Sequence, residues 1–117
     1  MNLFSKQLDD TGRIKLLKLT GEMDASLAAW VQQGIEKIIQ DGCRGLTLDM
    51  SGVDYIDSSG IRVLLSSYKK LKKLGGRINI LNPSEKVLMI LELADLIDVL
   101  KIFKTMDEAV ADLSIAP

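Results

Sequence analysis

The fold of this chain is constrained most by an alternation of two apolar patterns along its 117 residues. Short apolar runs, such as residues 46–50, have the length of buried strands. Longer segments, such as residues 61–74, instead repeat apolar residues every three or four positions, as one face of a helix does. Strands that alternate with helices predict a mostly parallel sheet with helices packed against it. We therefore expect the α/β class.

The first two strand-like runs have no helix between them. Residues 4–8 and 13–20 flank the sequence Asp-Asp-Thr-Gly at residues 9–12, which is typical of tight turns. This pattern predicts an antiparallel hairpin at the start of the otherwise parallel sheet.

The remaining elements follow from apolar spacing and from residues that cap helices. Asp24 is expected to cap a helix at residues 25–40, and Ser84 a helix that runs to about residue 93. Strands are expected at residues 46–50, 78–81 and 99–102, with a turn at Ser51-Gly52, and two more helices at residues 59–74 and after the capping box Thr105-Met106-Asp107-Glu108. The chain is thus predicted to be a single domain over residues 1–117, with about five strands and four helices.

Two adjacent serines stand where a strand-like segment passes into the helix at residues 59–74. At such a junction Asp57 or Ser58 can serve as the N-cap, because both residue types accept hydrogen bonds from the free backbone amides of the first turn. A serine at this place can also accept a phosphoryl group, since the helix dipole favours an anion there. Local chemistry leaves both interpretations open.

The residues around this junction resemble the central motif of the STAS domain, and specifically that of the bacterial anti-sigma factor antagonists. The motif reads Asp54-Tyr55-Ile56-Asp57-Ser58-Ser59-Gly60-Ile61. Similarity continues at residues 19–24, 75–80, 90–96 and 102–103, in the order that the family has, so that it covers nearly the whole chain.

The resemblance implies a phosphorylation-controlled binding module rather than an enzyme. In that family the serine after the motif aspartate, here Ser58, is phosphorylated by an anti-sigma factor with serine kinase activity. The unmodified antagonist binds that factor and frees a sigma factor, and a serine phosphatase resets the phosphorylated form. The resemblance also implies a set of residues around the phosphosite that contact the partner: Asp24, Asp54, Asp57, Ser59, Gly60 and Arg62. Arg62 departs from the small residue that many antagonists carry, which bears on the identity and fit of the partner.

Other functions are open on the same residues. A STAS domain can be a subunit of a larger signalling scaffold or of a lipid-transport assembly. A small hydrolase would use Ser58 with Lys69 or Asp57 as base, but the chain has no histidine for the Ser-His-Asp arrangement. A receiver domain would need an acidic pair after a strand, whereas Asp9-Asp10 precedes a turn and another strand. We expect no catalytic residue, no cofactor and no metal site.

The overall charge and the single cysteine narrow the class of partner. A formal net charge of −1 argues against a dedicated nucleic-acid binder, which would carry a basic excess. Cys43 stands alone and is expected to be buried and reduced. No signal-peptide pattern and no apolar run of about 20 residues is present, so that we expect a cytoplasmic protein without a membrane partner. Separately, we expect a monomer or a weak dimer.

Three further features have competing interpretations. The cluster Lys69, Lys70, Lys72 and Lys73 fits a solvated helix end better than a surface for anionic membranes or nucleic acid. Ser84 fits a helix cap better than a second phosphosite. Trp30 fits a partner contact and a partly buried core residue equally well.

Overall fold

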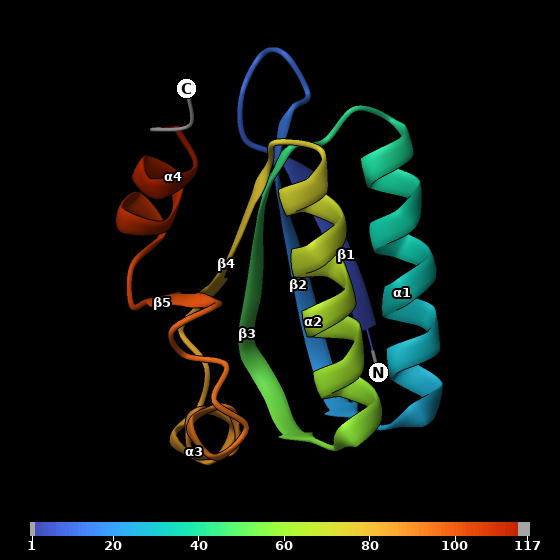
Figure 1. Cartoon of the computed structure of the whole chain (residues 1–117), viewed down its shortest axis with the longest axis vertical. Helices are drawn as coiled ribbons and strands as arrows, with labels where there is room; N and C mark the ends of the chain where they lie inside the picture. Colours follow the sequence, from blue (N-terminus) through green and yellow to red (C-terminus); the bar gives the residue numbers. More distant parts are fainter. Residues whose placement is uncertain (1, 115–117) are drawn as a thin grey trace.

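A computed structural model describes residues 2–114, which form five strands and four helices (Figure 1). The strands are β1 (Asn2–Gln7), β2 (Ile14–Met23), β3 (Gly45–Ile56), β4 (Arg77–Leu81) and β5 (Lys101–Phe103). The helices are α1 (Ala25–Gln40), α2 (Ser58–Lys73), α3 (Glu85–Leu93) and α4 (Met106–Ser114). The element order and the α/β class are those predicted from the sequence.

The strands form one sheet in which the spatial order is the sequence order, β1-β2-β3-β4-β5. β1 and β2 are antiparallel and the other neighbours are parallel, which confirms the hairpin and the mostly parallel sheet. In the hairpin turn the carboxylate of Asp9 accepts hydrogen bonds from the hydroxyl of Thr11 at 2.7 Å and from the amide of Gly12 at 3.0 Å. These hydrogen bonds lower the pKa of Asp9, and the bond from Thr11 has the largest effect.

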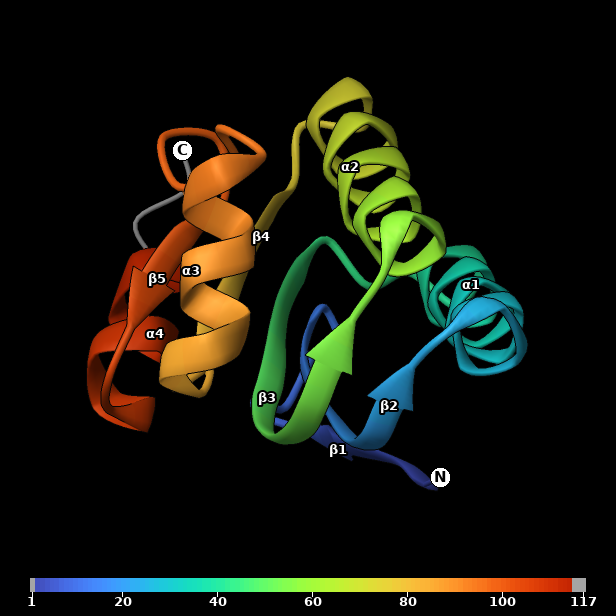
Figure 2. The same cartoon turned by 90° about the horizontal axis from the view of Figure 1, so that it is seen from below.

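The helices form layers on both faces of the sheet. α1 and α2 lie side by side on one face, and α4 packs against β3 and β4 on the other (Figures 1 and 2). α3 lies beside the last part of β3, at the end of the molecule where α2 begins. The core between the sheet and the first helices includes the fully buried residues Leu17, Leu19, Leu27, Val31, Leu46, Leu48, Leu64, Leu71 and Ile80.

β3 differs from its prediction, because the turn expected at Ser51-Gly52 is wrong. β3 is continuous over Gly45–Ile56, and its register against β2 shifts twice, between Lys18 and Thr20 and between Gly21 and Glu22. At each shift β3 has one more residue than β2, which is the pattern of a β-bulge. At the first bulge the Asp49 carboxylate accepts hydrogen bonds from the amide and the hydroxyl of Ser51, at 3.0 and 2.7 Å. Small and polar residues serve bulges and turns alike, which explains the wrong prediction.

The last strand also lies later than predicted. Residues 99–102 were expected to form it, but β5 comprises Lys101–Phe103. The apolar residues before it belong to a buried turn, in which the amide of Leu100 donates to the carbonyl of Leu96 at 2.7 Å. Both side chains are buried, so that core packing rather than strand pairing accounts for this apolar run.

Three local predictions are confirmed, namely the two helix caps at Ser84 and Thr105 and the burial of Cys43. Ser84 caps α3, since its hydroxyl accepts a hydrogen bond from the amide of Val87 at 3.2 Å. Thr105 accepts one from the amide of Glu108 at 3.3 Å, as in the predicted capping box. Cys43 is buried, and burial raises the pKa of its thiol. Within residues 2–114, no helix has both the length and the apolar character that crossing a bilayer requires.

Candidate phosphorylation site and partner surface

The candidate site is formed where the neighbouring parallel strands β2 and β3 end at the same edge of the sheet. Met23 pairs with Ile56 at the end of the shared register, so that the residues that follow, Asp24 and Asp57, lie next to each other. Each of these aspartates begins a helix, α1 and α2 respectively (Figure 2). Two helix N-termini therefore open onto one surface.

The N-cap of α2 is Asp57. One carboxylate oxygen of Asp57, Oδ1, accepts hydrogen bonds from the amide of Ser59 at 2.8 Å and from that of Gly60 at 3.2 Å. This settles which residue caps the helix, and it leaves Ser58 as the first helical residue. The capping task falls to the carboxylate, so that the Ser58 hydroxyl is not needed to hold the helix.

The two serines of the motif differ in exposure. Ser58 is exposed, and its hydroxyl has no hydrogen-bond partner in residues 2–114. Ser59 lies one position further along the helix and is half-buried. A phosphate on Ser58 would stand at the helix N-terminus, where the helix dipole favours an anion.

Gly60 holds the first turn of α2 against the strands. A Cβ atom at this position would lie 2.6 Å from Cγ1 of Ile56 and 2.9 Å from Cγ of Met23, which is closer than van der Waals contact allows. The amide of Asp57 also donates to the carbonyl of Met23 at 3.3 Å. Because Gly60 has no side chain, the first turn of α2 lies close against Ile56 and Met23, and this packing holds the backbone two residues after Ser58.

Three other predicted residues are exposed on the elements that lead into or form the first turns of α1 and α2. Asp24 is exposed, and its Oδ1 accepts a hydrogen bond from the amide of Leu27 at 3.1 Å as the N-cap of α1. Asp54 is exposed and is the extra residue of the second bulge in β3. Arg62 is exposed on the first turns of α2 and forms no ion pair with any residue from 2 to 114. Of the predicted site residues, Gly60 alone is buried.

A contact between β3 and α3 extends this surface beyond the residues predicted from sequence. The ammonium of Lys86 lies over the ring of Tyr55, 5.4 Å from its centroid, and Tyr55 remains 41% exposed. Lys86 is thus a neighbouring cation beside a largely acidic surface. No local pattern signals it, because the two residues come from distant parts of the sequence.

The structure also bears on Trp30 and on metal binding. Trp30 lies on α1 and is 44% exposed, so that a surface role for it is open. Among residues 2–114 no group of three or more Cys, His, Asp or Glu side chains is arranged to hold a metal ion.

Comparison with known proteins shows the same fold and the same domain family. The family model of the STAS domain matches residues 5–109. An anti-sigma F factor antagonist from Paenibacillus polymyxa is 24% identical over 103 residues, which cover 87% of this chain and 88% of that protein.

Solved structures agree with this match. The crystal structure of a candidate anti-sigma factor antagonist from Thermotoga maritima has a TM-score of 0.88 and 26% identity, and the match covers 96% of this chain and 94% of that one. The Bacillus cell fate determinant SpoIIAA, solved in its phosphorylated form, has a TM-score of 0.73 and 21% identity, with 95% and 98% covered.

Proposed function

The chain belongs to the STAS domain family, and we propose that it is an anti-sigma factor antagonist whose binding to its partner is controlled by phosphorylation of Ser58. The name of the Paenibacillus polymyxa relative supports the general function. The single observation that carries the finer proposal is the exposed Ser58 hydroxyl, free of hydrogen bonds to residues 2–114, at the first position of α2.

The proposed partner is an anti-sigma factor with serine kinase activity. Unmodified antagonist binds this factor and so frees a sigma factor, whereas phosphorylated antagonist does not bind until a serine phosphatase removes the phosphate. The existence of a phosphorylated form of SpoIIAA supports the phosphorylation step, and the fold that it shares with this chain makes the comparison relevant.

The proposed control is electrostatic. Phosphorylation adds about −1.5 to −2 charges at neutral pH, at a surface that already exposes Asp24 and Asp54. A partner that covers this surface must desolvate the new dianion or oppose it with its own carboxylates. A loss of 2.7 kcal/mol of binding free energy weakens a complex about 100-fold. A surface charge alone can therefore switch binding off.

The residues around Ser58 have different parts in this proposal. Asp24, Asp54, Ser59 and Arg62 form the surface that the partner contacts, and Asp57 holds the start of α2 through its two capping bonds. Gly60 acts from beneath, because its lack of a side chain lets α2 approach Met23 and Ile56. Phosphorylation leaves these packing contacts in place, so that the switch acts at the surface.

The test is to map the phosphate after the purified protein has been incubated with ATP and lysate of its source organism. We expect phosphate on Ser58 in the wild type and in Ser59→Ala, and none in Ser58→Ala. Phosphate on Ser58→Ala at the wild-type level, together with its loss from Ser59→Ala, would overturn the assignment. A subunit of a larger assembly would instead keep its partners in gel filtration whether or not Ser58 is phosphorylated.

A further inference from the structure

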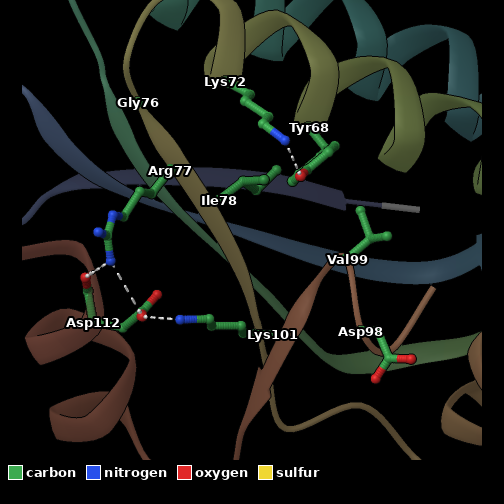
Figure 3. Close-up of a pocket in the computed structure, with 9 residues that line it drawn as sticks. All are labelled: Tyr68, Lys72, Gly76, Arg77, Ile78, Asp98, Val99, Lys101 and Asp112. Carbon is green, nitrogen blue, oxygen red and sulfur yellow. Dashed lines mark hydrogen bonds and ion pairs between the residues drawn. The ribbon is translucent and has the colours of Figure 1, made fainter. Parts of the chain in front are cut away.

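A cavity of about 310 Å³ lies toward the other end of α2 (Figure 3). α2 contributes Tyr68 and Lys72 to its wall, β4 contributes Arg77 and Ile78, and further residues come from the segment around β5 and from α4. Tyr68 is ten residues beyond Ser58, which corresponds to about 15 Å along a helix. The cavity is therefore separate from the candidate phosphorylation site.

Two cations of the cavity wall share one carboxylate. A terminal nitrogen of Arg77 lies 3.8 Å from Oδ1 of Asp112, and Nζ of Lys101 lies 3.4 Å from the same oxygen. The other oxygen, Oδ2, accepts a hydrogen bond from the amide side chain of Asn79 at 3.0 Å. The Asp112 side chain is only 10% exposed, so that it is a fixed point for both cations. One carboxylate cannot neutralise two cations, and a positive charge remains.

A third cation, Lys72, forms no ion pair with a carboxylate of residues 2–114. Nζ of Lys72 donates to the hydroxyl of Tyr68 at 3.2 Å and lies 5.5 Å from the centroid of the same ring. The hydroxyl and the ring of Tyr68 are both neutral, so that they do not offset the positive charge of Lys72, and its ammonium is available to an anionic ligand. The Tyr68 ring, Ile78 and Val99 give the cavity an apolar part beside these cations.

One wall residue, Asp98, would repel an anionic ligand. Asp98 is exposed and forms no ion pair with any residue from 2 to 114. Its carboxylate points away from the side chain of Lys101 (Figure 3). With three cations and two carboxylates among its lining residues, the cavity keeps a net positive charge.

We propose that this cavity binds a small ligand in which an anionic oxygen group, phosphate or carboxylate, is attached to an aromatic or aliphatic body. Lys72 and the pair Arg77 and Lys101 would hold the anionic group, because charge-assisted hydrogen bonds to such oxygens are the strong ones. Tyr68 and Val99 would pack against the body. Small-molecule sites usually combine an apolar lining with a few placed polar groups, and this wall is more charged, since five of its nine residues are Lys, Arg or Asp.

The test is a titration monitored through the amide chemical shifts of the protein. Three probes distinguish the contribution of the anionic group from that of the apolar body. Phenyl phosphate supplies both parts, inorganic phosphate the anion only, and benzyl alcohol the ring only. We expect saturable shifts around Tyr68, Arg77 and Lys101 with phenyl phosphate, at millimolar affinity for so small a molecule. The other two should bind at least fivefold more weakly. Benzoate then tells whether a carboxylate serves as well as a phosphate.

Substitutions at two exposed wall residues should change the affinity for phenyl phosphate in opposite directions. Lys72→Gln should weaken phenyl phosphate binding by about threefold to tenfold, and Asp98→Asn should strengthen it by about twofold to fivefold, because each changes one charge near the anion in solvent. Lys69→Gln removes an exposed lysine of the same helix outside the cavity and should change affinity by less than a factor of two.

Three results would overturn the proposal. The first is the absence of saturation, and the second is equal binding of phenyl phosphate and inorganic phosphate. The third is an equal loss of affinity in Lys72→Gln and Lys69→Gln, which would indicate unspecific attraction to a basic helix end. Ser58→Ala should bind phenyl phosphate like the wild type, so that the result is independent of the proposed function.

Discussion

The N-termini of α1 and α2 lie at the same edge of the sheet but differ in how they are packed against it. Both follow the end of a strand, both are capped by an aspartate, and their strands are neighbours. α1 has Leu27 three residues after its cap, whose side chain is fully buried. α2 has Gly60 at the corresponding position, whose missing side chain lets the backbone meet Met23 and Ile56.

This difference shows how a side chain can be exposed at a helix start whose backbone is held firmly in place. α1 is held by a side chain that reaches into the core, whereas the start of α2 is held by close backbone packing and two capping bonds. The serine at the first position of α2 then has no structural task. Its modification can change a surface while the support beneath it stays the same.

The largest expected effect concerns the partner and compares the two helix starts directly. Phosphorylation of Ser58 should weaken binding to the proposed kinase partner about 100-fold, and Ser58→Asp should weaken it about tenfold, because aspartate carries less charge than phosphate. Ser26→Asp puts the same charge on the exposed first turn of α1 and should weaken binding less than threefold. Titration calorimetry measures all three. Equal losses for Ser26→Asp and Ser58→Asp would mean that the surface does not distinguish the two helices.

The next effect concerns the glycines of the two helices. Gly60→Ala should lower the free energy of unfolding by about 2 kcal/mol, since its Cβ would lie within 3 Å of Met23 and Ile56 and overpacking typically costs about 1–3 kcal/mol. Gly34→Ala in α1 meets only the end of the Leu3 side chain and should raise the free energy by up to about 1 kcal/mol through helix propensity. Urea denaturation gives both values, and a stable Gly60→Ala would contradict the packing argument.

A smaller effect separates the two caps. Asp57→Ala and Asp24→Ala should each destabilise the protein by about 1 kcal/mol, the usual cost of losing an N-cap. The loss should be greater for Asp57, whose carboxylate accepts two amide hydrogen bonds against one for Asp24. Asp57→Asn keeps a capping oxygen and should recover most of the stability. The comparison fails if Asp24→Ala has the lower urea midpoint.

The smallest expected effect is that of the phosphate on stability. Phosphorylation of Ser58 should change the free energy of unfolding by less than about 1 kcal/mol, because the dipole favours the anion and repulsion from Asp57 opposes it by a similar amount in solvent. Amide shifts should then change only near residues 54–62. Widespread changes that reach β5 would mean that the switch is conformational.

The two helix starts are also where prediction from sequence is most successful. An aspartate before an apolar segment of helical spacing predicts the cap of α1 at Asp24. For α2 the sequence narrows the cap to Asp57 or Ser58, and the structure has Asp57 in that place. The failures come from packing that local patterns do not contain. Ser51 has the composition of a turn but lies in a bulge, and the apolar run at residues 99–100 belongs to a buried turn before the strand.

The candidate site is predictable in part for the same reason. The motif identifies Ser58 and its neighbours, but the free hydroxyl depends on Asp57 taking the cap and on Gly60 packing against two strands. The Tyr55–Lys86 contact joins elements that are distant in sequence. The cavity at the other end of α2 draws its wall from four parts of the chain, and no sequence motif marks it.

The identity of spatial and sequence order in the sheet has a consequence for how the chain is made. Each strand from β2 onward pairs with the strand that precedes it, so that a nascent chain leaving the ribosome can add every new strand to an edge that already exists. No strand has to be inserted between two that are already paired. Synthesis proceeds from the N-terminus, so that the strands become available in the order in which they pair. By the time Ser58 has been synthesised, the strands beneath it, β2 and β3, have both been made.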